Sequence, residues 1–291
     1  MSDRNPQRPP AVGLVVHGGR RDACDAARTA ASQLQEIGAR VVGVDGDNWS
    51  SAAVELRDPS DFGKGLDVVL ALGGDGTFLR AAYLSRDRGV PVLGVNLGRL
   101  GFLSELETPQ VPAAVGQLVR GEFTVEERMT LAVEVLDADG RVVETTWALN
   151  DASVERTEPR RLIVLEVRVD ETMFANVPAD GLICATPTGS TAYAFSAGGP
   201  ILSPLVDAIL LTPVAPHSLF DRTLVIDPRE SLVVRPVGGN NACVVSCDGR
   251  ESILVPDGGA VRVSRGDAPV RLARLGPSDF YQRVRDKFGL A

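Results

Sequence analysis

Residues 66–77 read Leu-Asp-Val-Val-Leu-Ala-Leu-Gly-Gly-Asp-Gly-Thr, an apolar run that ends in three glycines around one carboxylate. The apolar residues 68–72 suit a strand that is buried on both faces, as in a parallel sheet. Residues 77–82 read as the start of a helix. A strand, a glycine turn and a helix N-terminus together favour anion binding, because free N–H groups and the helix dipole point to one place.

Asp75 is the unusual residue of this turn. A carboxylate beside bound phosphates repels them unless a divalent cation intervenes or the carboxylate takes a proton. The turn therefore indicates phosphoryl chemistry, and an Asp-Gly turn without chemistry is the alternative. The pattern is neither the dinucleotide fingerprint GxGxxG nor a Walker loop, which needs Gly-Lys-Ser/Thr. We expect Gly73, Gly74, Gly76 and Thr77 to form a loop that binds the donor phosphates.

The composition excludes several classes of partner. The 291 residues suffice for one large domain or two ordinary ones, and the formal net charge is −8 without a basic block. Nucleic acid and anionic membranes are therefore poor partners. No apolar run approaches the roughly 20 residues of a membrane span, and the polar N-terminus lacks the core of a signal peptide. Among the four cysteines only Cys243 and Cys247 are close in sequence, which is weak evidence for zinc. We expect reduced thiols and a cytoplasmic location.

The first part of the chain alternates strand and helix signals, which predicts a doubly wound, Rossmann-like α/β domain over residues 1–122. Predicted strands cover residues 12–17, 41–44, 66–72 and 90–95, and predicted helices cover 22–37, 77–87 and 109–120. Residues 45–65 and 96–103 are predicted loops. Because ligands in such sheets gather at the carboxyl ends of strands, the glycine turn and the loop that starts at Asn96 are expected on one edge.

From about residue 123 the apolar residues alternate with period two, as in 131–136 and 162–169, and Asp-Gly or Gly-Gly turns recur. This pattern predicts an antiparallel, β-sandwich-like domain over residues 123–274. The last stretch, 277–290, is amphipathic and helical. We expect this tail, about 275–291, to pack back onto the first domain.

Two segments of the second part carry candidate chemistry. Asn150 and Asp151 follow an apolar residue and offer an amide and a carboxylate that could clamp the vicinal hydroxyls of a ribose; a capped turn is the alternative. Residues 180–193 run from a strand into a segment with four hydroxyl residues, where a polar ligand could lie against the backbone and Tyr193 could stack on a ring. This segment does not match GxSxG, so a serine hydrolase is disfavoured, and a Ser/Thr-rich turn is the alternative.

Taken together, these segments resemble the NAD kinase family. The resemblance lies in four ordered blocks: Gly73-Gly74-Asp75-Gly76-Thr77, Asn96-Leu97-Gly98 with Leu100-Gly101-Phe102-Leu103, Leu149-Asn150-Asp151, and Asp180-Gly181 through residues 186–193 to Gly198-Gly199-Pro200. The first block is shared with lipid kinases and phosphofructokinases, whereas residues 186–193 are more specific. His17-Gly-Gly-Arg20 resembles actinobacterial members.

The resemblance implies a two-domain enzyme that transfers a phosphoryl group from ATP or polyphosphate to the 2′-hydroxyl of the adenosine ribose of NAD. Asp75 would be the general base, and Mg²⁺ would be carried on the donor phosphates without direct protein ligands. It further implies a homodimer or homotetramer, and we expect the β domain to form the interface. The residues expected to bind NAD are Asp75, Gly76, Arg80, Phe102, Asn150, Asp151, Arg161, Asp180, Thr188, Thr191, Ala192, Tyr193, Ala194, Phe195 and Ser196.

Two positions depart from the family pattern. Pro178 stands where an Arg or Lys is frequent, and Arg250 aligns roughly with a position that often holds Gln or His.

Three other functions are alternatives to NAD phosphorylation. A GGDG-type lipid kinase would need an apolar acceptor groove, an NAD(P)-sensing module would need no base, and an NAD-dependent dehydrogenase would need the absent GxGxxG.

Overall fold

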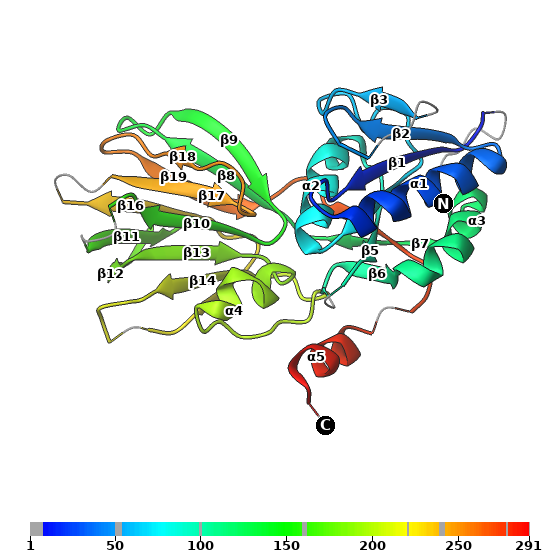
Figure 1. Ribbon diagram of the computed structural model, residues 1–291. Coiled ribbons are helices and arrows are strands. Elements are labelled where there is room, and N and C mark those ends of the chain that lie inside the picture. Colours follow the sequence, from blue (N-terminus) through cyan, green and yellow to red (C-terminus); the bar gives the residue numbers. More distant parts are fainter. Residues whose placement is uncertain are drawn as a thin grey trace. The chain divides into compact units, whose positions relative to one another are not determined.

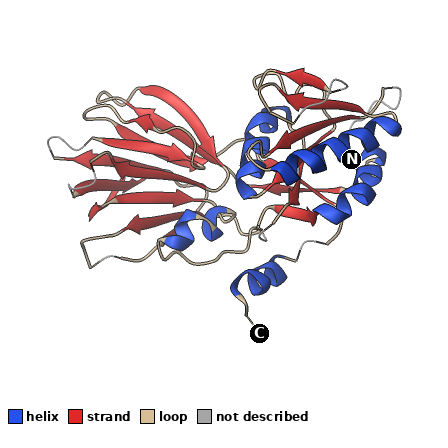
Figure 2. Ribbon diagram, in the orientation of Figure 1, coloured by secondary structure: helices blue, strands red, loops and turns tan. Residues whose placement is uncertain are grey.

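The structure is a computed structural model that describes residues 8–49, 54–98, 101–158, 162–219, 221–238, 242–277 and 279–290. It divides into two compact units, one made of Met1–Glu127 with Val270–Ala291 and the other of Arg128–Pro269. The first unit mixes helices and strands, and the second consists mainly of strands (Figures 1 and 2). The unit boundary differs from the sequence-based one at residue 122, because a strand that follows residue 122 joins the first sheet.

Unit 1 contains eight strands and four α-helices among the described residues. The strands are β1 (Ala11–Val16), β2 (Arg40–Val44), β3 (Glu55–Arg57), β4 (Val68–Gly73), β5 (Val92–Asn96), β6 (Ser104–Glu107), β7 (Thr124–Arg128) and β20 (Val270–Arg274). The helices are α1 (Arg21–Glu36), α2 (Asp75–Ser85), α3 (Val111–Arg120) and α5 (Phe280–Phe288), with short 3₁₀ turns at Arg86–Arg88 and Thr108–Gln110.

The sheet of unit 1 has the order β3-β2-β1-β4-β5-β20-β7, with β6 also paired to β5. Neighbouring strands from β3 to β5 run parallel, and so do β6 and β20 relative to β5. The parallel sheet confirms the predicted α/β class. Strand β3 lies inside the predicted loop 45–65, which is therefore wrong there; its three residues are exposed or half-buried and show no apolar run.

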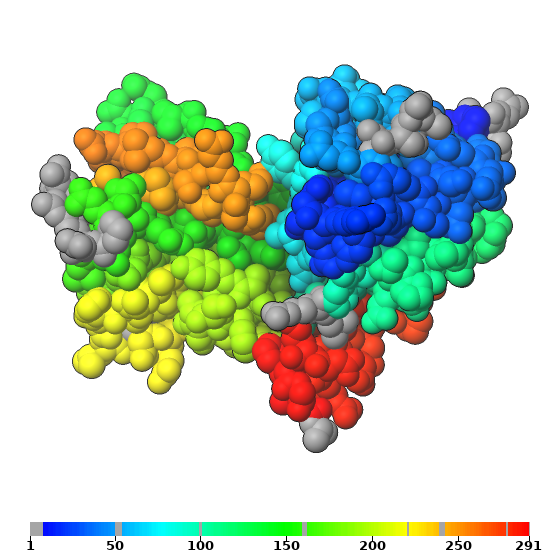
Figure 3. Space-filling model, viewed as in Figure 1, coloured from blue at the N-terminus to red at the C-terminus, as the bar shows by residue number. Residues whose placement is uncertain are grey.

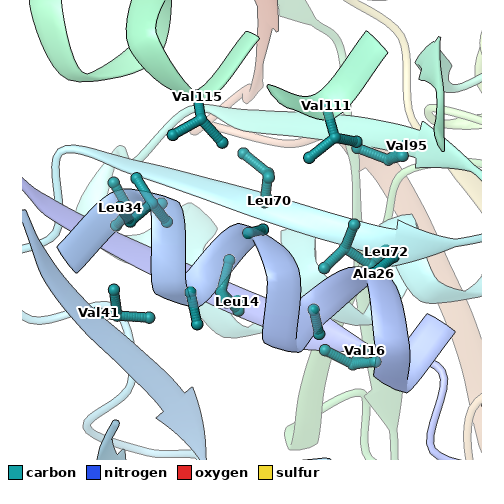
Figure 4. Close-up of a cluster of buried hydrophobic side chains, with 14 of the residues drawn as sticks. Leu14, Val16, Ala26, Leu34, Val41, Leu70, Leu72, Val95, Val111 and Val115 are labelled. Carbon is teal, nitrogen blue, oxygen red and sulfur yellow. The ribbon is translucent and has the colours of Figure 1, made fainter. Parts of the chain in front are cut away.

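Both faces of this sheet are covered. On one face α1 and α3 pack on alternate residues of β1 and β4, and Figure 4 shows Leu34 and Val115 over Leu14 and Leu70. On the other face α2 lies close, because a β-carbon at Gly94 would meet the ring of Phe78. The two layers of helix explain why the strands read as continuous apolar runs.

Unit 2 is built from two six-stranded sheets. One has the order β15-β14-β13-β10-β17-β18 and the other β12-β11-β16-β19-β8-β9, and the strand pairs with a determined register in both are antiparallel. Their inward side chains form one shared core, which confirms the antiparallel β class. The strands are β8 (Leu131–Leu136), β9 (Val142–Ala148), β10 (Asp151–Arg156), β11 (Ile163–Val169), β12 (Thr172–Ala179), β13 (Gly181–Ala185), β14 (Ile209–Val214), β15 (Leu224–Ile226), β16 (Leu232–Val237), β17 (Cys243–Cys247), β18 (Ile253–Leu254) and β19 (Ala260–Arg265).

The C-terminal helix α5 belongs to unit 1 and lies within the predicted stretch 277–290. Asp279 caps it by accepting a hydrogen bond from Gln282 N at 2.8 Å, and Gly289 ends it in a left-handed conformation. This segment, drawn red, forms part of the molecular surface in Figure 3. Within the described residues, no helix is long and apolar enough to cross a membrane.

Candidate active site

The glycine turn follows β4 directly, and the helix begins earlier than residue 77, the predicted start. Gly74 is the N-cap of α2 and Asp75 is its first residue. A β-carbon at Gly73 would overlap the side chain of Thr77, which is itself buried. Gly74 and Gly76 instead face open space. Gly73 therefore serves internal packing, and the other two glycines leave main chain open to a ligand.

The carboxylate of Asp75 is held by main-chain N–H groups of the loop that follows β5. Phe102 N donates to Oδ2 at 3.0 Å, and Leu103 N donates to Oδ1 at 3.1 Å. A β-carbon at residue 101 would overlap this carboxylate, so the glycine at this position leaves the space that the carboxylate occupies. An ionised carboxylate has about four acceptor positions. Two of them are occupied, and among the described residues no hydrogen bond takes up the other two.

The loops at the carboxyl ends of β1 and β5 flank this turn, because β4 lies between these strands. The side chain of Arg20, which follows β1, binds Asp22 and donates to the carbonyl of Leu97 after β5. The Asn96 side chain closes its own turn through Gly98. Several polar groups thus meet at this edge, as expected for a doubly wound sheet.

Arg80, a predicted NAD contact, lies one turn along α2 and is exposed. Its guanidinium binds both carboxylate oxygens of Asp47, at 2.7 and 3.2 Å, and the Asp47 side chain is only 7% exposed. The Phe102 ring packs against Phe280 and Phe288 of α5, and its predicted place near the adenine stays a prediction. Both residues are therefore already engaged within unit 1.

In unit 2 the predicted ribose clamp sits on a turn organised by Asp248. Both oxygens of this carboxylate accept hydrogen bonds from main-chain N–H groups, with 2.7 Å to Leu149 N, 2.7 Å to Asn150 N and 3.2 Å to Asp151 N. A β-carbon at Gly189 would overlap the Asn150 carbonyl, so residues 186–191 pack directly on this turn. The structure thus brings two predicted segments together.

Most hydroxyl groups of residues 186–191 serve this packing. Thr186 and Ser190 are fully buried and donate to the carbonyls of Leu149 and Pro187, at 2.6 and 2.7 Å. These two hydroxyls therefore bind main chain of the same fold, and the expectation that a polar ligand lies against the backbone of this segment stays a prediction. Thr188 is also buried, and its hydroxyl accepts a hydrogen bond from the buried Arg128 at 3.3 Å.

Next to this turn, the short helix α4 (Tyr193–Ser196) follows a 3₁₀ turn at Gly189–Thr191 and gathers acidic groups. The carboxylate of Asp151 accepts a hydrogen bond from the Tyr193 N–H, and the Tyr193 hydroxyl hydrogen-bonds to Glu155. Asp180 forms an ion pair with Arg156 at 2.9 Å. Tyr193, Phe195 and Ser196 are exposed, whereas Ala194 is buried in a small apolar cluster, so its side chain is not available to a ligand.

Burial and, to a smaller extent, the neighbouring carboxylate of Asp248 together raise the pKa of Asp151 to about 7, against the opposing hydrogen bond from the Tyr193 N–H. Burial likewise raises the pKa of Asp248, although the three N–H groups of its turn oppose the shift. Near neutral pH Asp151 is therefore divided between a form that accepts and a form that donates hydrogen bonds. Such perturbed groups concentrate at functional sites.

The sequence of the chain matches two models of one protein family. Residues 12–123 match the family model described as ATP-NAD kinase N-terminal domain, and residues 149–275 match the ATP-NAD kinase C-terminal domain. The chain belongs to the NAD kinase family. Its relatives include an NAD kinase of Rhodococcus erythropolis, which is 43% identical over 297 residues that cover 95% of this chain and 93% of the relative.

Solved structures agree with this family. An NAD kinase from Archaeoglobus fulgidus in complex with ATP is 25% identical, with a TM-score of 0.72 and coverage of 97% of this chain and 98% of its own. Yeast NADH kinase complexed with NADH, at 23% identity, shares the fold with a TM-score of 0.88 over 98% of this chain and 89% of its own. The family is one of phosphotransferases, and the lipid kinase alternative finds no support in these comparisons.

The two departures from the NAD kinase pattern have structural partners. Arg250 lies over the Trp147 ring at 5.3 Å from its centre and donates to the carbonyls of Cys247 and Trp147. Pro178 lies in β12, and its carbonyl accepts a hydrogen bond from His217 N at 2.8 Å. Arg161, a predicted NAD contact, lies outside the described residues.

Sequence reasoning assigned no role to Asp248, Glu155, Arg128 or Asp47. The Asp-Gly pair at residues 248–249 was visible as a turn, and the positive φ of 52° at Asp248 fits that signal. The other three residues lie 33 to 60 positions from the predicted site residues that they contact: Asp47 binds Arg80, Glu155 binds Tyr193, and Arg128 binds Thr188. No local sequence pattern indicates a partner at such a distance.

Proposed function

We propose that this chain transfers the γ-phosphoryl group of ATP to the 2′-hydroxyl of the adenosine ribose of NAD, which yields NADP and ADP. The observation that carries the proposal is the Asp75 carboxylate at the first residue of α2, beside the open main chain of Gly74 and Gly76. A kinase needs a base for the acceptor hydroxyl next to donors for the phosphates, and this turn supplies both.

On the donor side, the N-terminus of α2 and the open glycines offer N–H groups to the phosphates. Asp75 would accept the proton of the 2′-hydroxyl as its oxygen attacks the γ-phosphorus and the bond to the β-phosphate oxygen breaks. Inorganic polyphosphate presents the same phosphoanhydride to the same groups, so it is the second donor to test. The structure of the A. fulgidus NAD kinase was solved in complex with ATP, which supports ATP as the donor.

On the acceptor side, Asn150 and Asp151 would hold the ribose hydroxyls. Tyr193 and Phe195, both exposed on α4, would lie against a ring of NAD. Asp180, held by Arg156, would accept a hydrogen bond from the same substrate. Arg80 and Phe102 would also contact NAD. In the structure Arg80 binds Asp47 and Phe102 packs against Phe280, so each would either keep this partner or exchange it for NAD.

A divalent cation would neutralise the charge of the donor phosphates. In the described part of the chain, no group of three or more His, Cys, Asp or Glu side chains could hold a metal ion. We propose that Mg²⁺ is carried on the donor phosphates. We also propose a cytoplasmic location, because the four cysteines are buried free thiols, and a homodimer or homotetramer with the β unit as the interface.

The test is to incubate the chain with NAD, ATP and Mg²⁺ and to measure NADP, with polyphosphate as a parallel donor. Asp75→Asn should fold normally and lose turnover by about 10²- to 10⁴-fold, the usual contribution of a general base. Asp87→Asn is the matched control, since its exposed carboxylate lies just beyond α2. Wild-type turnover in Asp75→Asn, or absence of NADP with either donor, would contradict the proposal.

A further inference from the structure

Helix α5 covers the segment that holds Asp75. The ring of Phe102 lies 6.3 Å from the ring of Phe280 and 6.4 Å from that of Phe288, measured between centroids. The ammonium group of Lys287 lies 5.4 Å from the centre of the Phe102 ring. Three residues of α5 therefore surround the side chain of Phe102, and the main-chain N–H of this residue binds the Asp75 carboxylate.

A buried charge cluster binds the residues that follow Leu103 in the same segment. Arg283 of α5 donates to the carbonyl of Ser104 and to Glu105 Oε2 at 3.2 Å. Glu105 also pairs with Arg274 of β20 at 2.6 Å, and Arg274 pairs with Glu126 at 2.9 Å. Each of these four side chains is less than a fifth exposed. Two cations and two carboxylates balance one another, which is the condition for keeping charges buried.

Arg283 and Asp75 are also close enough to interact electrostatically. Burial and the neighbouring Arg274 lower the pKa of Arg283, whereas the carboxylates of Glu105 and Asp75 raise it. The guanidinium thus attracts the Asp75 carboxylate while its hydrogen bond fixes the next residues of the chain, Ser104 and Glu105. Ser104 follows Leu103 directly, and Leu103 N donates to Asp75. Only one peptide unit separates the two contacts.

We propose that Arg283 is a positioning residue for phosphoryl transfer: through Ser104 and Glu105 it holds the Phe102 and Leu103 N–H groups that orient the Asp75 carboxylate. The catalytic chemistry stays with Asp75, and the inference rests on the proposed function of that residue. A base displaced by about 1 Å can lose a hundredfold in rate, so a clamp on its two hydrogen-bond donors matters for turnover.

The test compares Arg283→Gln with Arg285→Gln, which removes the same charge from the exposed face of the same helix. Arg283→Gln should lower kcat by about ten- to a hundredfold while the KM for ATP changes little, because the glycine turn itself is untouched. Arg283→Lys, which keeps the charge and a donor, should recover part of the loss. Arg285→Gln should match the wild type.

Hydrogen exchange of residues 101–105 gives a readout that does not depend on activity. Arg283→Gln should speed exchange of the Phe102 and Leu103 amides and leave those of α2 unchanged. If the wild type makes no NADP, the proposed function fails, and the exchange rates still decide whether Arg283 holds the segment. An unchanged kcat in an active Arg283→Gln enzyme overturns the positioning role, and so does unchanged exchange.

A second variant guards against a folding defect. Phe288→Ala removes one of the rings against Phe102 and leaves the charge cluster intact. Phe288 is 38% exposed, so its loss should cost little stability. If the inference holds, this variant shows a smaller fall in kcat and faster exchange of the same two amides. Wild-type values of both in Phe288→Ala, together with an unfolded Arg283→Gln, would overturn it.

Discussion

At the scale of single residues, Asp151 makes stability depend on pH. Its pKa is raised to about 7 in the folded chain, chiefly by burial, from the 3.8 of an unperturbed aspartate. The folded state therefore keeps a proton that the unfolded state has released between these values. The stability that this proton provides is complete below about pH 4 and is lost as the pH rises through 7.

Asp151→Asn should remove this dependence. The amide oxygen can still accept the hydrogen bond from Tyr193 N–H, and the ionisable group is gone. Between pH 5 and pH 8 the wild type should lose on the order of 2 kcal/mol relative to Asp151→Asn, since one pKa unit corresponds to about 1.4 kcal/mol. Denaturant unfolding at both pH values measures the difference. Asp139→Asn, with an exposed side chain, serves as control, and parallel curves for Asp151→Asn and wild type would contradict the assignment.

At the scale of elements, the turn before β10 depends on one distant carboxylate. Asp248 accepts three main-chain hydrogen bonds on its two oxygens, and an asparagine has only one oxygen to offer. Asparagine tolerates the positive φ of this position, so the backbone itself is not strained by the change. Asp248→Asn should therefore destabilise the protein by about 1–3 kcal/mol, the usual cost of an unmet buried group.

The same variant should also raise the KM for NAD, because the turn carries Asn150 and Asp151. Thermal unfolding and NAD titration measure the two effects. Asp257 is exposed and lies in another turn of unit 2. Asp257→Asn therefore serves as the control and should leave both the stability and the KM for NAD unchanged. A stable Asp248→Asn protein with wild-type KM would show that the turn holds without its carboxylate.

The elements that sequence reasoning predicted are those with a local cause. Apolar runs mark β1, β4 and β5, and the left-handed Gly121 ends α3 at the predicted residue. Strands β3 and β6 are short and have exposed or half-buried residues, so no apolar pattern marks them. The position of β20 between β5 and β7 depends on pairing across about 150 to 180 residues, which local patterns do not contain.

The candidate site follows the same division. Asp75, Asn150 and Asp151 stand at strand ends, so their residue types were sufficient to select them. Asp248 and Arg283 act on main-chain groups of other segments, 97 to 99 and 179 positions away. A contact to a main-chain group does not depend on the side chain of the residue contacted, so the type of that residue does not indicate the contact. Residues that orient a site are therefore harder to find from sequence than residues that line it.

At the scale of the whole molecule, the chain returns from unit 2 to complete the sheet of unit 1. Val270, Leu272 and Ala273 of β20 are fully buried, and Leu272 pairs with Val92 of β5. A chain that stops after Pro269 would lack this strand and expose β5 and β7 along their length. We expect it to be insoluble or unfolded, because an open strand edge beside a bared core promotes aggregation.

A chain that stops after Gly276 provides the contrast, since it keeps β20 and loses only α5. No residue of α5 is fully buried, and Glu105 retains Arg274 as a partner when Arg283 is absent. We expect this shorter chain to be soluble and folded by circular dichroism, with kcat lowered at least as far as in Arg283→Gln. If it unfolds as completely as the chain that stops after Pro269, then α5 supports the fold of unit 1 itself, which would contradict this expectation.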